Sequence, residues 1–215
     1  MPYKNKVRKS QSDSVYHLYG RGLGSFPIYY HADDYKLFLY LLKKYLTPGF
    51  KEIKIFRGEK VAVLANSVVG LVEVYCYCLM PTHFHMLVKN LETRGITELM
   101  RRVIAVYTNY FNTKYERQGQ LIQGGYRAVL VTNDNQFVHI SRYIHLNPVK
   151  AGLSEKVVDY PYNSYLNYLN RKLSSWLVLN ERLLGATDYA NIERYLKDFD
   201  DESEIGFNPS RVEPC

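Results

Sequence analysis

The order of β-type and helix-type segments constrains the fold of this chain more than any other feature. Runs rich in β-branched and aromatic residues alternate with segments whose apolar residues recur at helical spacing. The sequence predicts strands at Ser14–Arg21, Leu71–Leu79, His83–Lys89 and Leu121–Val131, and helices at His31–Leu46, Ile96–Tyr115 and Asp134–Asn147. The first six elements follow the ferredoxin-like split βαβ order. We therefore expect an α+β protein, with two helices on one face of an antiparallel sheet and the other face free for function.

Turn residues separate these segments and mark one insertion. Met80-Pro81-Thr82 divides the two middle strands, which should form an antiparallel pair. The Phe50–Gly70 segment contains two short β-type runs, Ile53–Phe56 and Val61–Leu64, around Gly58. This pattern predicts a hairpin inserted between the first helix and the second strand.

Composition limits the number of domains and the cellular compartment. The 215 residues are 47% hydrophobic and 23% charged, a balance typical of one globular core. No apolar run approaches the ~20 residues that span a bilayer, and the basic N-terminus lacks the apolar segment of a secretory signal. Three cysteines suit a reducing compartment, so we expect a cytoplasmic protein without a membrane partner. The expected organisation is a basic arm at 1–13, a main domain at 14–152 with its hairpin at 50–70, a helical extension at 153–200 and an acidic, flexible tail at 201–215.

The positive charge is concentrated in the first 150 residues. They contain 21 Lys and Arg against 10 Asp and Glu, a net charge of +11, whereas residues 151–215 contain 7 against 11, a net charge of −4. Lys4, Lys6 and Arg8 belong to an arm that has no acidic residue before Asp13. This distribution is compatible with a nucleic-acid-binding body and equally with an ordinary solvated surface.

His83 and His85 are the first candidates for chemistry. Residues i and i+2 of a strand point to the same face, so the two imidazoles should project side by side while Phe84 enters the opposite layer. Two neutral imidazoles at that spacing can bind a divalent ion. A pair of this kind in a strand is also commonly structural, and the residues alone leave both interpretations open.

Tyr143 is the second candidate, on the last predicted helix. His139, Tyr143 and Asn147 are spaced four residues apart and share one helix face, beside an apolar stripe that should pack on the sheet. A tyrosine near a metal ion could attack a phosphate and form a phosphotyrosine bond. The chain has 21 tyrosines, most of which must be core or stacking residues, so spacing alone does not single out Tyr143.

Three basic residues lie near predicted turns. Arg21 is flanked by glycines, Arg127 follows Gly124-Gly125-Tyr126, and Lys150 comes shortly after Pro148. Glycine beside arginine lets a phosphate approach the backbone, although a surface arginine in a loop is equally ordinary.

Taken together, four motifs resemble those of the single-tyrosine HUH transposases, and most closely the branch of REP-associated tyrosine transposases. They are Tyr16-His-Leu-Tyr-Gly-Arg-Gly22, Cys78-Leu-Met-Pro-Thr-His-Phe-His85, Gln123-Gly-Gly-Tyr-Arg127 and Arg142-Tyr-Ile-His-Leu-Asn-Pro-Val-Lys-Ala-Gly152. The segment from Asp159 to Tyr165 is similar to the one after the catalytic helix in that branch. The resemblance covers about residues 14–200.

The resemblance implies the HUH endonuclease fold and a bacterial, metal-dependent enzyme of DNA transposition and recombination that nicks and rejoins single-stranded DNA. His83 and His85 match the metal-binding histidines, and Tyr143 matches the tyrosine that keeps a 5′-phosphotyrosine while a 3′-OH is released. Asn147 falls where the family places a polar third ligand for Mg²⁺ or Mn²⁺, and His139 is a candidate for orienting the metal ligands. Arg21, Arg127, Lys150, Lys4, Lys6 and Arg8 are the expected DNA contacts. The implied substrate is hairpin or repeat-associated DNA, bound by a monomer or a homodimer.

Two other functions fit part of the pattern. A ferredoxin-like sheet with exposed aromatic residues can bind nucleic acid without catalysis. A metal phosphodiesterase that uses water would need the histidines but would form no bond to Tyr143. The chain also departs from the family at Gly20, where related sequences often have Asn, and in its long 50–70 insertion.

Overall fold

A computed structural model describes residues 10–169, 174–184 and 192–195. Its main sheet is antiparallel and has four strands in the order β4-β5-β1-β6. These strands are β1 (Ser14–Arg21), β4 (Val72–Met80), β5 (His83–Asn90) and β6 (Arg127–Leu130). The expected α+β fold with a ferredoxin-like antiparallel sheet is confirmed, and β5 occupies an interior position between β4 and β1.

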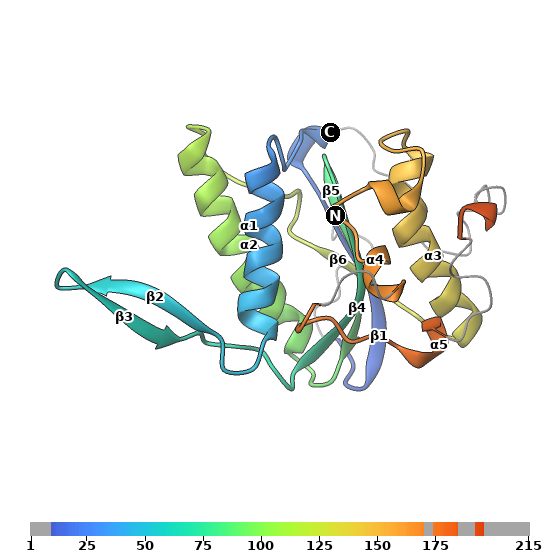
Figure 1. The fold of residues 1–215 in the computed structure, drawn as a ribbon, viewed down its shortest axis with the longest axis horizontal. Helices are drawn as coiled ribbons and strands as arrows, with labels where there is room; N and C mark the ends of the chain where they lie inside the picture. The colour runs from blue at the N-terminus through green and yellow to red at the C-terminus, as the bar shows by residue number, and fades with distance from the viewer. Residues whose placement is uncertain (1–9, 170–173, 185–191, 196–215) are drawn as a thin grey trace.

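The long helices cover both faces of this sheet (Figure 1). On one face, α1 (Ala32–Leu46) and α2 (Gly95–Lys114) bury their apolar residues against Leu18, Phe84 and Met86. On the other face, α3 (Asp134–Lys150) packs on Cys76, Cys78 and Leu87. The face left open by α1 and α2 therefore carries the helix that bears Tyr143, and the apolar stripe of α3 packs on the sheet as the sequence predicted.

Two sequence-predicted boundaries also differ. The strand predicted at Leu121–Val131 is limited to β6, because Gly124 and Gly125 have φ of 63° and 83° and break the extended backbone. The last helix continues through Pro148 to Lys150 instead of ending at Asn147. Proline in the last turn removes only one hydrogen bond, and Ala151 N still donates to Asn147 O at 2.9 Å.

Only short helical elements follow α3 in the described part of the chain. They are the 3₁₀ turn η2 (Val157–Asp159), α4 (Tyr165–Tyr168) and α5 (Glu181–Leu184), and a further 3₁₀ turn η1 (Leu23–Ser25) follows β1. The basic residues Lys4, Lys6 and Arg8 and the 201–215 tail lie outside the described residues. None of the described helices combines the length and the apolar character needed to span a bilayer.

The inserted segment forms a separate two-stranded sheet, as the sequence predicted. Strands β2 (Lys51–Phe56) and β3 (Glu59–Leu64) pair antiparallel and join no other strand. Figure 1 shows this hairpin projecting from the body beside α1 and α2, on the side away from α3.

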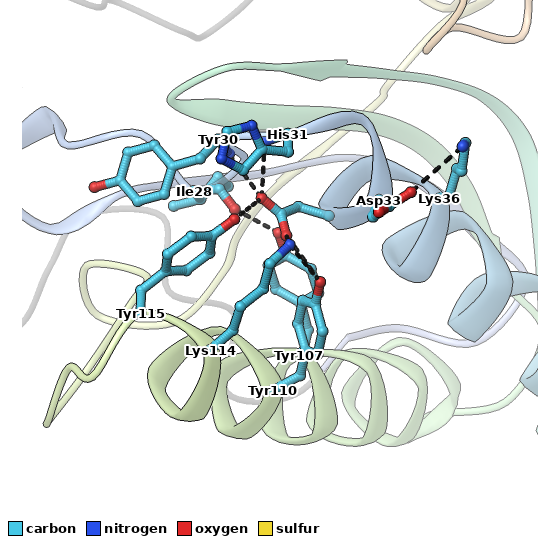
Figure 2. Close-up of polar contacts among 10 residues, drawn as sticks. Ile28, Tyr30, His31, Asp33, Lys36, Tyr107, Tyr110, Lys114 and Tyr115 are labelled. Carbon is cyan, nitrogen blue, oxygen red and sulfur yellow. Dashed lines mark hydrogen bonds and ion pairs between the residues drawn. The ribbon is translucent and has the colours of Figure 1, made fainter.

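A buried carboxylate joins α1 to the end of α2. Asp34 is fully buried and accepts hydrogen bonds from Lys114 Nζ at 2.8 Å, Tyr115 Oη at 2.7 Å and Tyr110 Oη at 3.0 Å. The amides of Tyr30 and His31 donate to it as well, each at 2.9 Å. Figure 2 shows the two tyrosines and the lysine converging on this carboxylate. The network ties the loop after β1 to both helices.

Candidate active site

A polar band crosses the sheet on the face covered by α3. In β1, alternation places His17, Tyr19 and Arg21 on this face, while Tyr16 and Leu18 pack against α1 and α2. The register pairs Arg21 with His83 and Tyr19 with both His85 and Arg127. Directly paired residues of adjacent strands share a face. The band therefore brings together Arg21, His83 and Arg127, which belong to separate sequence motifs, and Tyr19 lies between Arg127 and His85.

The two histidines of β5 lie side by side. The ring centroids of His83 and His85 are 5.0 Å apart, and the ring planes are nearly perpendicular at 84°. Phe84 points to the opposite face and packs against Phe38 of α1, with ring centroids 5.4 Å apart. Burial of Phe84 in the main core fixes the alternation, so both imidazoles are held on the α3 side.

Burial keeps these imidazoles neutral. It lowers the pKa of His83 to about 4, and the nearby charge of Arg21 adds to the effect. Burial lowers the pKa of His85 well below its usual value, and His83 and His17 contribute in the same direction. A metal ion binds neutral imidazole, so no proton has to be displaced at neutral pH.

Each histidine has a hydrogen-bonding partner at Nδ1. Thr82 Oγ1 lies 2.9 Å from His83 Nδ1, and His17 Nε2 lies 2.9 Å from His85 Nδ1. A partner at Nδ1 orients the ring and makes Nε2 the nitrogen that would bind a metal. His17 was missed by the sequence reasoning. The register of β1 on β5 that brings it to His85 depends on tertiary pairing.

Tyr143 faces this band from α3. Its ring centroid is 5.4 Å from that of His85 and 6.0 Å from that of His17, both in edge-on arrangements. Asn133 caps the helix by accepting a hydrogen bond from Gln136 N at 2.8 Å. The side chain of Tyr143 is only 5% exposed, so it lies between the helix and the sheet.

A second buried contact sets the position of α3. His145 Nε2 lies 2.7 Å from Ser164 Oγ, and Ser164 Oγ accepts a hydrogen bond from Tyr77 N of β4 at 2.8 Å. The helix is thus connected to the sheet through Ser164. His145 and Ser164 were not among the predicted site residues, because each needs a partner distant in the sequence.

The other predicted site residues occupy different surroundings. Asn147 is half-buried one turn after Tyr143, and its Nδ2 donates to Tyr143 O at 3.0 Å. His139 lines a hollow with Asn133, Gln136 and Arg142, which contains neither of the β5 histidines. Lys150 is exposed at the end of α3.

The chemistry of the donor set decides whether a metal ion fits. Within residues 10–169, 174–184 and 192–195, no group of three or more His, Cys, Asp or Glu side chains is arranged to hold one. Two neutral imidazoles with oriented rings still provide two nitrogen ligands, and a third would have to be an amide oxygen, water or DNA phosphate. Such a set suits Mn²⁺ and, with oxygen ligands added, Mg²⁺. Cys76 and Cys78 are free, buried thiols with raised pKa and are poor ligands.

The fold and the facing groups define a class. An antiparallel sheet that carries a histidine pair, with a tyrosine-bearing helix against it, is the arrangement of the HUH fold. The chain matches the family model described as "Transposase IS200 like" over residues 60–147. This match confirms the resemblance to that transposase family indicated by the sequence motifs.

One solved structure supports the fold, and a second is too dissimilar to do so. A REP-associated tyrosine transposase bound to a REP hairpin superposes with a TM-score of 0.53 and 15% sequence identity, covering 82% of this chain and 92% of that one. A bacterial tRNA(His) guanylyltransferase-like protein in complex with ATP has a TM-score of 0.39 and 9% identity over 94% of this chain and 74% of that one, which is too low to bear on function. A comparison with curated protein sequences finds no match.

Proposed function

We propose that this protein is a metal-dependent single-stranded DNA endonuclease and strand transferase that acts through a covalent 5′-phosphotyrosine intermediate on Tyr143. One observation carries the proposal: the Tyr143 ring lies 5.4 Å from the ring of His85, whose neighbour on the same strand face is His83. A nucleophile beside two neutral nitrogen ligands is the minimum set for metal-assisted attack on a phosphate. The match to a transposase family supports the same reaction class.

The proposed reaction exchanges one ester bond for another. Tyr143 Oη forms a bond to phosphorus, and the bond from phosphorus to the 3′-oxygen breaks. The phenol loses its proton as the new bond forms, and the departing 3′-oxygen takes one up. Because the phosphotyrosine bond is an ester of similar energy, attack by another 3′-OH can reverse the step and join two strands. Conservation of the bond energy in the phosphotyrosine ester suits strand transfer by a transposase better than simple hydrolysis.

The residues of the polar band have separate proposed roles. His83 and His85 would hold Mg²⁺ or Mn²⁺ through Nε2, with Asn147 as a third ligand. Such an ion neutralises phosphate charge and makes phosphorus more electrophilic. Arg21 and Arg127 lie on the same sheet face and would position the phosphate backbone, and Lys150 would contact it at the end of α3. Lys4, Lys6 and Arg8 are proposed contacts from the N-terminal arm.

The substrate class follows from the comparison and the charge. The similar REP-associated transposase is bound to a REP hairpin, and we propose a hairpin or repeat-associated DNA with a single-stranded flank for this chain. The net charge of +11 over residues 1–150 favours such a polyanion. Chromosomal DNA as substrate would place the protein in the cytoplasm, in agreement with the free thiols of Cys76 and Cys78.

One observation favours the alternative, a nucleic-acid-binding protein without catalysis. Tyr143 is 5% exposed, so its hydroxyl can reach a phosphate only if a neighbouring segment moves. The test therefore has to separate binding from covalent attachment.

The experiment incubates the full-length protein with hairpin oligonucleotides that carry single-stranded flanks, in Mg²⁺, Mn²⁺ or EDTA. We expect an adduct that survives denaturing electrophoresis, needs the metal and maps to Tyr143. Tyr143→Phe should bind the oligonucleotide but form no adduct. Tyr75→Phe is the matched control, because Tyr75 also packs against α3 and is equally 5% exposed. An adduct formed by Tyr143→Phe, or cleavage with no protein-linked DNA, would overturn the proposal.

A further inference from the structure

The β2–β3 hairpin carries a cluster of solvent-exposed apolar side chains that no other part of the described chain covers. Every strand residue except Glu52 is exposed. Ile53, Ile55 and Phe56 are 64%, 75% and 65% exposed, and Leu64 is 64% exposed. Clustered apolar residues of this kind on a soluble protein mark an interaction surface. A two-stranded hairpin alone also gains little stability from its own strands.

The base of the hairpin is fixed to the body. Glu52 accepts a hydrogen bond from Lys44 Nζ of α1 at 2.5 Å, and Val68 N donates to Tyr45 O at 2.9 Å. Arg102 of α2 donates to the carbonyls of Asn66 and Ser67. The direction in which the hairpin projects is therefore set by α1 and α2.

The two faces of the hairpin differ in charge. The register places Lys51, Ile53, Ile55, Lys60, Ala62 and Leu64 on one face, which we call the lysine face. It has two ammonium groups, an apolar centre and no acidic residue. Both acidic residues of the strands, Glu52 and Glu59, lie on the opposite face with Lys54. Among the described residues, Lys51 and Lys60 form no ion pair.

The tip adds a guanidinium at a conformational cost. Arg57 and Gly58 have φ of 51° and 86°, as in the two-residue turns that usually carry Asn, Asp or Gly at the first position. A long side chain in this left-handed region is disfavoured. Arg57 nevertheless occupies it, and its Cζ lies 5.4 Å from the ring centroid of Phe56, which is on the face opposite the lysine face. The turn thus presents a cation at the outermost point of the hairpin.

We propose that the hairpin is an arm that binds the double-stranded stem of the DNA substrate, with the lysine face toward the duplex and Arg57 at its tip. This inference rests on the proposed function for the identity of the substrate. The positive charge of the lysine face favours DNA as its binding partner. Two ammonium groups around an apolar centre, with a guanidinium at the tip of the hairpin, suit a groove between phosphate strands, where β-ribbons and apolar side chains are known to insert. A second copy on the lysine face would bring four ammonium groups together without an acidic residue to neutralise them.

The position of the arm predicts which substrates it can reach. Ile28 N and Tyr29 N donate to Pro81 O, so the chain just before α1 lies beside the His83 end of β5. The arm begins after the other end of α1, whose 15 residues span about 22 Å at 1.5 Å per residue. A duplex rises about 3.4 Å per base pair, so a stem shorter than about six pairs should not reach from the band to the arm.

The test measures binding of the full-length protein in EDTA, so that cleavage does not interfere. Two labelled DNA hairpins share the loop and single-stranded flank but have stems of about 5 and 14 base pairs. For the triple variant Lys51→Ala/Arg57→Asn/Lys60→Ala we expect about tenfold weaker binding of the long stem, unchanged binding of the short stem and a salt dependence shallower by about two to three phosphate contacts. Lys54→Ala, on the opposite face, should change binding less than twofold. Asn at position 57 suits the turn, and a thermal unfolding midpoint matching the wild type verifies the fold.

Equal affinity of the triple variant and wild type for the long stem would overturn the inference. So would a wild-type dimer that Ile53→Glu/Ile55→Glu converts to a monomer, because the arm would then bind a second copy. The adduct assay keeps the two proposals separate. If the triple variant binds the long stem as tightly as wild type while the Tyr143 adduct forms normally, only the arm proposal is refuted. If the triple variant binds the long stem more weakly but no adduct forms with wild type, only the catalytic function is refuted.

Discussion

Nδ1 of His85 and Nε2 of His17 lie 2.9 Å apart in a fully buried contact between β5 and β1. The rings are also stacked, with centroids 5.1 Å apart. His17 therefore holds the ring of His85 from the side opposite to its proposed metal-binding nitrogen. Contacts of this kind orient a ligand and raise its basicity without touching the metal.

His17→Ala should weaken binding of Mn²⁺ by 10- to 100-fold, about the range found when such partners are removed. His17→Gln keeps a polar group near Nδ1 and should lose less. Calorimetric titration of Mn²⁺ without DNA measures the effect independently of activity. His31→Ala is the control, because His31 is exposed at the start of α1. Equal metal affinity of His17→Ala and wild type would refute the positioning role.

Ser164→Ala should destabilise the protein by about 1–3 kcal/mol, the cost of leaving buried polar groups without partners. Ser164 Oγ connects His145 of α3 with Tyr77 N of β4, and its loss removes both contacts. Urea unfolding gives the free energy. Ser175→Ala, at an exposed position, should change it by less than about 0.5 kcal/mol. A similarly small effect at Ser164 would show that the α3 connection is unimportant for stability.

Asp34 should make stability depend on pH in the acid range. Burial alone would raise the pKa of its carboxyl, but hydrogen bonds from Lys114, the amides of His31 and Tyr30, and Tyr115 outweigh burial and lower the pKa to about 2. A folded-state pKa below the unfolded value stabilises the protein above about pH 4. We expect about 2 kcal/mol from this group, lost progressively as the pH falls from about 5 to 2.

Unfolding of Asp34→Asn between pH 2 and 7 tests this expectation. The variant should be less stable at neutral pH, and its stability should fall less steeply on acidification. Asp33→Asn is the matched control. The carboxylate of Asp33 is 76% exposed, and its ion pair with Lys36 Nζ, at 3.4 Å, is exposed to solvent and weak (Figure 2). This change should therefore leave the pH dependence of stability unchanged. Identical profiles for wild type and Asp34→Asn would contradict the role given to Asp34.

Gly20→Ala should cost about 1–3 kcal/mol by overpacking the core. A Cβ at position 20 would lie 2.6 Å from Cε1 of the buried Phe84 ring. The absence of a side chain at position 20 therefore accompanies the large Phe84 ring between the two histidines. In the Phe84→Leu background the cost of Gly20→Ala should be smaller, and a double-mutant cycle in urea measures the coupling. Additive effects would show that the two positions are independent.

Much of the fold could be predicted from local pattern. Runs of β-type residues predicted β1 at its observed bounds and the hairpin, and helical spacing of apolar residues placed α1 and α2, because composition and periodicity are local properties. The strand before α3 was predicted too long, since its β-type residues are interrupted by two left-handed glycines. The shared face of His83 and His85 followed from the period of a strand alone.

Other features depended on contacts between distant segments. The sequence by itself determined that two imidazoles project together from one strand and that Tyr143 lies on a helix. Only the tertiary structure decided how α3 sits on the sheet, so that the Tyr143 ring lies edge-on to His85, and that His17 supports His85. The physical reason is the distance along the chain over which each effect acts. Alternation and helical period act over a few residues, whereas strand register and helix docking are set by burial of apolar surface between residues far apart in the chain.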